Sequence, residues 1–279
     1  MSPNADLETL RRYGFTFSKA MGQNFLVNPS VCPRMAALCG ADKASGVLEI
    51  GPGAGTLTRE LAQAAGKVVA VEFDARLLPV LNETLAGLDN ITIVQGDFLA
   101  LDLRALLDEH FSGMDVYVCA NLPYYITSPV IMRLLESRLP FKNITVMVQR
   151  EAAERLCAAL GQRACGAITA AVQYYAEARP LFQVSRGSFL PAPNVDSTVL
   201  QLTPREAPPV RVDEAAFFRL IRAAFGQRRK TAANAISAGL GMPKAEVLAA
   251  MERAGIKPTA RAEEITMEGY AALVTEQKF

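Results

Sequence analysis

Residues 46–65 read GVLEIGPGAGTLTRELAQAA. The first five form an apolar run typical of a buried strand, and the last ten have the spacing of an amphipathic helix. Between them lie three glycines at alternate positions, Gly51, Gly53 and Gly55. Glycine lets the backbone turn sharply and approach a ligand closely because it carries no Cβ atom. A strand that passes through a glycine loop into a helix indicates an α/β fold.

The same alternation continues to about residue 150. Further apolar runs typical of strands lie at 68–73, 91–95, 114–120 and 144–149. Candidate helices lie between and after them, at 56–65, 75–86, 128–138 and 151–160. This order predicts a mostly parallel sheet. Two more runs, 167–182 and 197–204, flank a proline-rich loop and predict an antiparallel hairpin at the sheet edge, which gives seven strands.

A segment rich in proline and charge at about 204–213 is typical of a linker. We therefore expect one domain over residues 1–204 and a small all-helical domain over 205–279. Asp213 is placed to cap a helix over 213–225, and Pro243 and Gly255 bracket another. The net charge is only +1, but residues 1–204 hold 17 Lys and Arg against 19 Asp and Glu, whereas 205–279 hold 12 against 9. The basic excess lies at the C-terminal end.

Composition also limits the chemistry. The five cysteines are odd in number and none are spaced as Cys-x-x-Cys, so we expect neither a disulfide framework nor a zinc site. The single histidine, His110, gives little support to mechanisms that need a histidine base or a metal cluster, and no metal is expected. The first residues are too polar for a signal peptide and no stretch approaches a membrane span, so we expect a cytoplasmic protein.

Polar residues follow the strands at the edge where open α/β sheets bind ligands. A dinucleotide fingerprint needs a glycine at position 56, and Thr56 there argues against NAD. Glu72 ends the second strand, where a carboxylate can accept hydrogen bonds from both ribose hydroxyls. Asp97 follows the third strand, where it can accept a hydrogen bond from an adenine amino group. Taken singly, the glycine loop could be a tight turn, Glu72 an ordinary strand-end acid and Asp97 a cap. Together the three favour a nucleoside cofactor.

The sequence Asn121-Leu122-Pro123-Tyr124 follows the fourth strand. An adenine amine is a poor nucleophile because its lone pair is delocalised into the ring. If the Asn121 amide oxygen and the Leu122 carbonyl accept hydrogen bonds from its two N–H groups, they orient the nitrogen toward a methyl donor. Pro123 stiffens the loop, and Tyr124 offers a ring on which an unstacked base can rest. A turn with a buried aromatic is the alternative for Tyr124 alone.

With these residues, the chain resembles the ribosomal RNA adenine dimethyltransferase family, from about Arg11 to Val274. The stretches that carry the resemblance are KAMGQNFL at 19–26, LEIGPGAGTLT at 48–58, VEFD at 71–74, QGD at 95–97, NLPYYITSP at 121–129, MVQREAAERL at 147–156, FLPAPNVDS at 189–197 and AFGQRRKTAAN at 224–234. The resemblance implies a Rossmann-like, seven-stranded class I methyltransferase domain with a small all-helical C-terminal domain. It also implies S-adenosylmethionine as cofactor and dimethylation of two adjacent adenosines near the 3′ end of small-subunit ribosomal RNA.

Carried onto this sequence, the resemblance assigns Asn24 and Leu26 to the methionine end of the cofactor and the glycine loop to the cofactor. It assigns Glu72 to the ribose, Asp97 to the adenine and Asn121 to the reacting centre. Phe189 would close over the target adenine opposite Tyr124, and a hydrophobic anchor for its loop is the alternative. Two residues depart from the family pattern, Ala232 and Phe73, where bulkier or aliphatic residues are usual. We expect these departures to affect helix packing rather than chemistry.

The basic excess includes a cluster that we name the basic cluster: Arg219, Arg222, Arg228, Arg229 and Lys230. Phosphate contact is the functional interpretation, and a solvated helix face is the alternative. The resemblance favours the first, with the small ribosomal subunit as partner and a monomeric enzyme. Two other functions stay open: methylation of large-subunit ribosomal RNA or DNA adenine, and an assembly factor that acts mainly by binding.

Overall fold

The computed structural model describes residues 3–16, 24–227 and 229–276. Five residues of one quoted motif, 19–23, and Arg228 of the basic cluster lie outside the described residues. The chain divides into two compact units. The first consists of residues 1–153 with 178–204, and the second of 154–177 with 205–279.

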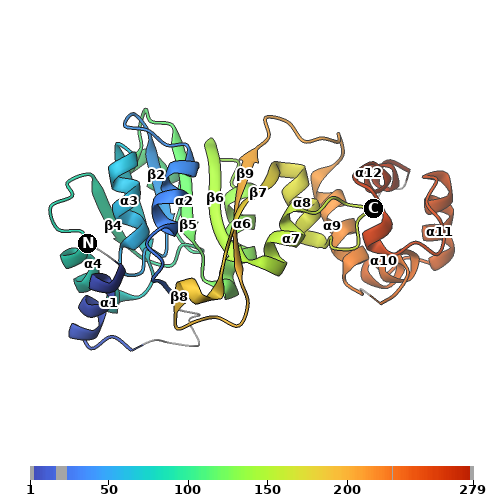
Figure 1. Cartoon of the computed structure of the whole chain (residues 1–279). Coiled ribbons are helices and arrows are strands. Elements are labelled where there is room, and N and C mark those ends of the chain that lie inside the picture. Colours follow the sequence, from blue (N-terminus) through green and yellow to red (C-terminus); the bar gives the residue numbers. More distant parts are fainter. Residues whose placement is uncertain (1–2, 17–23, 228, 277–279) are drawn as a thin grey trace. The chain divides into compact units, whose positions relative to one another are not determined.

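The first unit contains a seven-stranded sheet in the order β4-β3-β2-β5-β6-β9-β7 (Figure 1). Its strands are β2 (Gly46–Ile50), β3 (Lys67–Glu72), β4 (Ile91–Gln95), β5 (Val116–Asn121), β6 (Phe141–Gln149), β7 (Ala176–Val184) and β9 (Ser197–Pro204). From β4 to β6 all neighbours are parallel, whereas β9 is antiparallel to β6. The predicted strand number and the five predicted parallel strands are confirmed.

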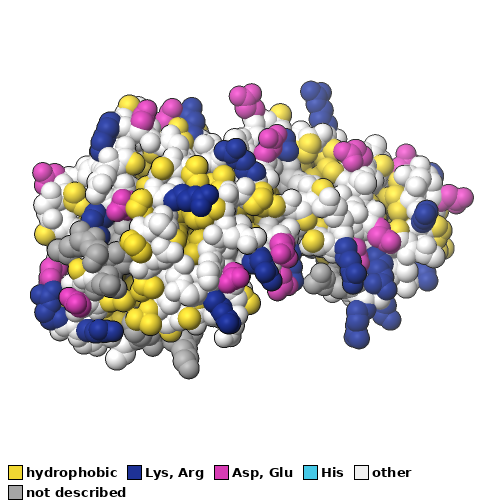
Figure 2. All heavy atoms as spheres, in the orientation of Figure 1, with side chains coloured by type: hydrophobic (Ala, Val, Ile, Leu, Met, Phe, Trp, Pro, Cys, Tyr) yellow, Lys and Arg dark blue, Asp and Glu magenta, His cyan; other side chains and the backbone are white. Residues whose placement is uncertain are grey.

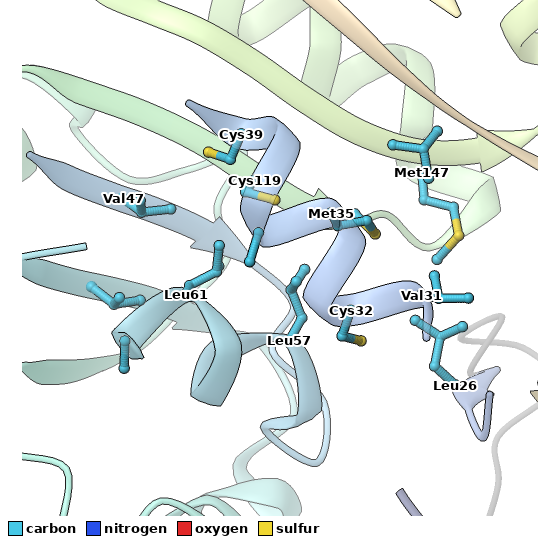
Figure 3. Close-up of a cluster of buried hydrophobic side chains, with 14 of the residues drawn as sticks. Leu26, Val31, Cys32, Met35, Cys39, Val47, Leu57, Leu61, Cys119 and Met147 are labelled. Atoms are coloured by element: carbon cyan, nitrogen blue, oxygen red, sulfur yellow. The ribbon is translucent and has the colours of Figure 1, made fainter. Parts of the chain in front are cut away.

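Burial explains why the central strands are continuous apolar runs. All five residues of β2 and five of the six in β3 are buried. A parallel sheet is covered by helices on its faces, so alternation of polar and apolar residues is not needed. Helices α2 (Val31–Cys39) and α3 (Thr56–Ala64) pack together, α2 on β5 and α3 on β3. Figure 3 shows their buried cluster, with Met35 of α2 beside Leu57 of α3 and with Cys119 of β5 inside the core.

The other elements of this unit connect the strands or cover the edge of the sheet. They are α1 (Pro3–Arg12), β1 (Phe25–Leu26), η1 (Ala75–Leu77), α4 (Leu78–Thr84), α5 (Leu103–His110), η2 (Tyr124–Ile126), α6 (Thr127–Glu136), η3 (Arg186–Ser188) and β8 (Phe189–Leu190), with α7 (Arg150–Cys157) at the boundary between the units. The helix predicted at 75–86 is divided into η1 and α4, and those predicted at 128–138 and 151–160 are confirmed as α6 and α7 with shifted ends.

A buried ion pair ties α1 to α3. The Asp6 carboxylate lies 2.9 Å from the Arg59 guanidinium and also accepts the Thr56 hydroxyl at 2.8 Å. Both charged side chains are almost fully buried, with relative exposures of 2% for Asp6 and 9% for Arg59. Since α3 begins at Thr56, this contact fixes the helix that follows the glycine loop.

One secondary-structure prediction is wrong. The run at 167–182 was expected to be a strand, but its first nine residues form α8 (Ala167–Tyr175) and only the rest belongs to β7. Three of the nine are alanine, which has the highest helix propensity, and the buried residues Ala170, Ala171, Tyr174 and Tyr175 repeat with helical spacing. The apolar run has no proline or glycine at the point where helix becomes strand.

The second unit is helical and larger than predicted. Its further elements are α9 (Glu214–Phe225), α10 (Ala232–Leu240), α11 (Lys244–Arg253), η4 (Ala262–Glu264) and α12 (Met267–Glu276). The predicted boundary at 204/205 left residues 154–177 in the other domain, yet they belong here because α8 and α9 share an aromatic core. Tyr174 stacks on Phe217 at 5.5 Å between ring centroids, and Tyr175 stacks on Phe218 at 5.4 Å.

Three predicted helix ends in this unit are confirmed. The Ala216 amide donates to the Asp213 carboxylate at 2.7 Å, so Asp213 caps α9. Pro243 and Gly255 bracket α11 as expected. None of the helices in the described ranges is long and apolar enough to cross a membrane.

Candidate active site

A cavity of about 380 Å³ lies in the first unit, at the carboxyl ends of β2, β3 and β5 and beside the loop after β4. It brings together predicted residues from six separate stretches of the chain. Those that line it are Asn24, Gly51, Gly53, Glu72, Asp97, Asn121, Leu122, Pro123, Tyr124 and Phe189. Ten of the predicted cofactor and reaction residues therefore share one space.

The glycine loop forms the floor near β2. Gly51, Gly53 and Gly55 have φ angles of 69°, 61° and 84°, a region that side chains with a Cβ atom rarely adopt. A Cβ atom on Gly53 would also lie 3.3 Å from the Phe25 ring. At this position both the backbone angle and the close neighbour favour glycine.

Glu72 lies beneath this loop and is 5% exposed. One carboxylate oxygen accepts the Gly53 amide at 3.2 Å, and the other accepts the Asp74 amide at 2.8 Å. Each carboxylate oxygen has two acceptor sites, so both can still accept a hydroxyl from a ligand. Burial raises the pKa of Glu72. The geometry is suited to holding a pair of vicinal hydroxyl groups.

A second carboxyl, Glu49, is buried at the end of β2 with 1% exposure. Burial raises its pKa to about 8, and the negative charge of Glu72 adds to this rise. Its Oε2 atom has no hydrogen-bond partner among the residues that the structure describes. Burial therefore favours the neutral form of Glu49, and of these two carboxyls only Glu72 lines the cavity.

Asp97 follows β4 and is exposed at the cavity. Its Oδ1 atom accepts the Leu99 amide at 2.9 Å, which is the local turn contact considered as the alternative. That contact holds the carboxylate in place and leaves Oδ2 for a donor such as an adenine amine. The turn and the ligand roles are thus compatible.

The loop after β5 is held by its backbone. The Leu122 amide donates to the Met147 carbonyl at 3.2 Å, and the Thr127 hydroxyl donates to the Pro123 carbonyl at 3.3 Å. Within the described chain, no donor reaches the Asn121 amide oxygen or the Leu122 carbonyl, and both residues line the cavity. Two acceptors on adjacent residues are therefore available for one amine.

Tyr124 is half-buried, and its hydroxyl is 2.9 Å from the Ser197 hydroxyl. Ser197 is the last residue of the stretch FLPAPNVDS and is fully buried at the start of β9. This hydrogen bond fixes the orientation of the tyrosine ring. Sequence reasoning missed the role of Ser197, although it had singled out the stretch that contains it.

Phe189 is 3% exposed and lines the cavity from β8. Strand β8 pairs with β1, so that Leu26 lies opposite Phe189 and Phe25 opposite Leu190. The Val27 amide donates to the Ser188 carbonyl at 2.8 Å, and the Asn28 side chain donates to the Ser188 hydroxyl at 3.2 Å. This pairing joins the Asn24 side of the cavity to the Phe189 side. Phe189 is both a loop anchor and a cavity residue.

Two predicted cofactor residues do not line the cavity. The Leu26 side chain is buried in the hydrophobic cluster of Figure 3 because its strand turns it away from the cavity. Gly55 is the N-terminal cap of α3, and a Cβ atom there would lie 3.0 Å from Leu85 and 3.1 Å from Thr84. Both residues support the site from outside.

Two exposed aromatic side chains at the cavity were not predicted as site residues. Phe73 is 60% exposed and Tyr125 is 56% exposed. The expectation that Phe73 affects helix packing is wrong, since its ring lies at the cavity. The unusual residue type after Glu72 was the signal available in the sequence. Nothing in the sequence indicated that Tyr125, the second tyrosine of NLPYY, is exposed at the cavity, because the exposure of a side chain depends on neighbours that are distant in sequence.

The described members of the basic cluster lie in the second unit. Arg219 and Arg222 are exposed on α9, and Arg229 and Lys230 are exposed in the turn before α10. Within the described ranges, none of the four forms an ion pair. Figure 2 shows Lys and Arg side chains gathered on one side of this unit. Four uncompensated cations suit an anionic ligand.

Residues 14–278 match the family model for ribosomal RNA adenine dimethylase. The chain belongs to this family. Similar family members include the ribosomal RNA small subunit methyltransferase A of Shouchella clausii, 46% identical over 98% of this chain and 96% of the relative. That of Geobacillus thermodenitrificans is 46% identical over 98% and 94%.

Two solved methyltransferase structures have the same fold. A dimethyladenosine transferase from Plasmodium falciparum matches with a TM-score of 0.73 and 26% identity, covering 90% of this chain and 96% of that one. The 23S rRNA methyltransferase ErmE matches with a TM-score of 0.67 and 27% identity, covering 92% and 100%. The predicted fold class, a Rossmann-like methyltransferase domain with a helical C-terminal part, is confirmed.

Proposed function

We propose that this protein is an S-adenosylmethionine-dependent enzyme that dimethylates N6 of two adjacent adenosines near the 3′ end of small-subunit ribosomal RNA. The observation that carries the proposal is the shared cavity. Acceptors suited to a nucleoside, Glu72 and Asp97, open into the same space as the paired acceptors Asn121 and Leu122. A methyl donor and an adenine amine can therefore meet there.

The cavity residues fit the proposed cofactor. Glu72 would hold the ribose hydroxyls, Asp97 the adenine amine, and the Gly51–Gly53 backbone and Asn24 the amino-acid end. The positive φ angles of the loop let its backbone lie close to a ligand. When bound, S-adenosylmethionine supplies an electrophilic methyl group on sulfur and leaves as a neutral thioether.

The protein's own part in the reaction is positioning. The Asn121 amide oxygen and the Leu122 carbonyl accept hydrogen bonds from the two N–H groups of the target amine. These contacts direct its lone pair toward the methyl group. Tyr124 and Phe189 hold the base between two rings, and Ser197 keeps the tyrosine in place. The cationic amine that forms releases a proton to water, so a strong base is not needed. The available acceptors at Asn121 and Leu122 support this role.

The choice of RNA rests on the relatives. The curated relatives at about 46% identity are named as small subunit methyltransferases, whereas the structure named for 23S rRNA is 27% identical. Small-subunit RNA is therefore favoured over large-subunit RNA or DNA. We further propose that the protein works in the cytoplasm as a monomer, and that the basic cluster, including Arg228, contacts RNA phosphates.

Replacing Asn121 with alanine tests the proposal. We expect methyl transfer to unmethylated small ribosomal subunits to fall about 10²-fold or more, in line with the loss of one transition-state contact. Subunit binding should be retained. The matched control is Asn143→Ala, which removes an amide from β6 that contacts Thr203 at the surface. Mass spectrometry of the RNA measures dimethyladenosine, and wild-type rates in Asn121→Ala would remove this residue from the reacting centre.

The same variant distinguishes an enzyme from an assembly factor that acts by binding. In a strain whose only copy is Asn121→Ala, dimethyladenosine should be lost. Normal subunit assembly in that strain would show that binding suffices for assembly. Defective assembly at unchanged subunit affinity would show that methylation itself is needed.

A further inference from the structure

The second tyrosine of the reaction loop, Tyr125, has no role in the reaction described so far. It belongs to the same short helical turn as Tyr124, η2, and lines the same cavity. Its side chain is 56% exposed, which makes it one of the large apolar side chains most open to solvent in the described chain. Within that part of the chain no hydrogen bond of its hydroxyl is found.

The two tyrosines face different surroundings. A 3₁₀ turn has three residues per turn, so successive side chains point about 120° apart. Tyr124 is directed to Ser197 in β9, with its hydroxyl 2.9 Å away. Tyr125 is therefore directed away from that contact, toward the rim of the cavity, where its ring is exposed.

The backbone that carries Tyr125 is fixed on both sides. The Ile126 amide donates to the Pro123 carbonyl at 3.2 Å, and the Thr127 hydroxyl donates to the same carbonyl at 3.3 Å. Leu122 and Thr127, which flank the turn, are 1% and 5% exposed. A rigid turn that presents an exposed ring loses little conformational freedom when a ligand binds.

The proposed substrate supplies a ligand for this ring. When one of two adjacent adenosines occupies the cavity, its neighbour has been removed from its stack and lies outside. Tyr124 and Tyr125 belong to one turn and both line the cavity, so a nucleotide next to the one on Tyr124 is within reach of the Tyr125 ring. Exposed aromatic rings bind unstacked bases and are tolerant of base identity because every base has a π-face.

We propose that Tyr125 stacks on the base adjacent to the target adenine and so positions the second adenosine of the pair. This inference rests on the proposed function and adds a substrate requirement to it: an unpaired neighbouring base, with a purine favoured by its larger ring surface. Tyr125 is a positioning residue, since it acts on the neighbour and not on the reacting amine.

The test compares Tyr125→Ala, Tyr125→Phe and wild type on unmethylated small ribosomal subunits. A stacked base contributes about 1–3 kcal/mol, so Tyr125→Ala should lower kcat/KM about 5- to 150-fold, mainly through KM. Tyr125→Phe keeps the ring and should restore kcat/KM to within about 2-fold. Tyr13→Ala is the matched control, because Tyr13 is a similarly exposed tyrosine, 48% exposed, that does not line the cavity.

A second substrate separates stacking from a merely structural effect. Subunits in which the neighbouring adenosine is replaced by uridine should be methylated less well by the wild type. Tyr125→Ala should show a smaller penalty for uridine, because the ring that senses the neighbour is gone. Equal penalties in both proteins, or wild-type kcat/KM in Tyr125→Ala, would overturn the inference. If the wild type forms no dimethyladenosine on either substrate, the proposed function itself fails.

Discussion

The buried carboxyl Glu49 should make the protein lose stability as the pH rises, and Glu49→Gln should remove that loss. The pKa of Glu49 is about 8 in the folded chain and 4.5 in an exposed state. Below pH 4.5 the carboxyl is protonated in both states and has no effect. Between these two values the folded chain holds a proton that the unfolded chain has released, so the free energy of unfolding decreases as the pH increases.

The size of this effect follows from the two pKa values. One extra bound proton in the folded state changes the free energy of unfolding by about 1.4 kcal/mol per pH unit. From pH 5 to pH 7.5, with partial ionisation at each end, the wild type should lose about 3 kcal/mol from this one group. Glutamine has nearly the shape of a protonated glutamate and cannot ionise. The stability of Glu49→Gln relative to wild type should therefore rise by about 3 kcal/mol over this range.

Urea unfolding at pH 5, 6, 7 and 7.5 measures the difference. The control is Glu136→Gln, which removes an exposed carboxyl from α6 and should not reproduce the change with pH. At each pH the free energy of unfolding of the wild type is subtracted from that of the variant. The change of this difference with pH is compared, because any pH-independent cost of the amide then cancels. A difference that is constant from pH 5 to 7.5 would mean that Glu49 ionises normally, and the argument from its burial would be refuted.

Three further outcomes are expected. Glu72→Gln should weaken cofactor affinity by about 10- to 150-fold in calorimetry, since a charged hydrogen bond contributes about 1.5–3 kcal/mol. In the wild type, the cofactor affinity should fall as the pH is lowered. This fall should begin at a higher pH than for an ordinary glutamate, because burial raises the pKa of Glu72. Unchanged affinity would contradict its role. Changing Arg229 and Lys230 to alanine should lower subunit affinity and reduce the slope of its logarithm against log salt by about 1.5, and an unchanged slope would make these residues a solvated surface. Arg59→Met leaves Asp6 buried and unpaired and should cost about 3–5 kcal/mol in urea unfolding, most of which Asp6→Asn in the same chain should restore.

The parts of the fold that were predicted correctly are those in which local pattern and tertiary surroundings agree. Continuous apolar runs between helical patterns identified β2 to β6, because buried parallel strands need no alternation. The run at 167–182 gave the opposite result. Its alanines and tyrosines suit either a strand or a helix, and the aromatic contacts that select the helix come from α9, which is remote in sequence.

In the candidate site, too, positions set by local sequence were predicted and orientations set by distant neighbours were not. Glu72, Asp97 and Asn121 were found because each directly follows a strand, and topology alone brings strand ends together. The orientation of a side chain is set by neighbours that sequence does not reveal. Leu26 therefore faces the core instead of the cavity, and the exposed ring of Tyr125 was not expected.

The pairing of β1 with β8 has a consequence during translation. Asn28 and Ser188 are 160 residues apart, so their contact closes a long loop and forms only after most of the chain has been made. A nascent chain that ends at Val184 already contains the glycine loop and the NLPY sequence, yet it lacks Phe189 and the Ser197 hydroxyl that orients Tyr124. The site can therefore be completed only after residue 197 has been made, when about two thirds of the 279 residues are already joined.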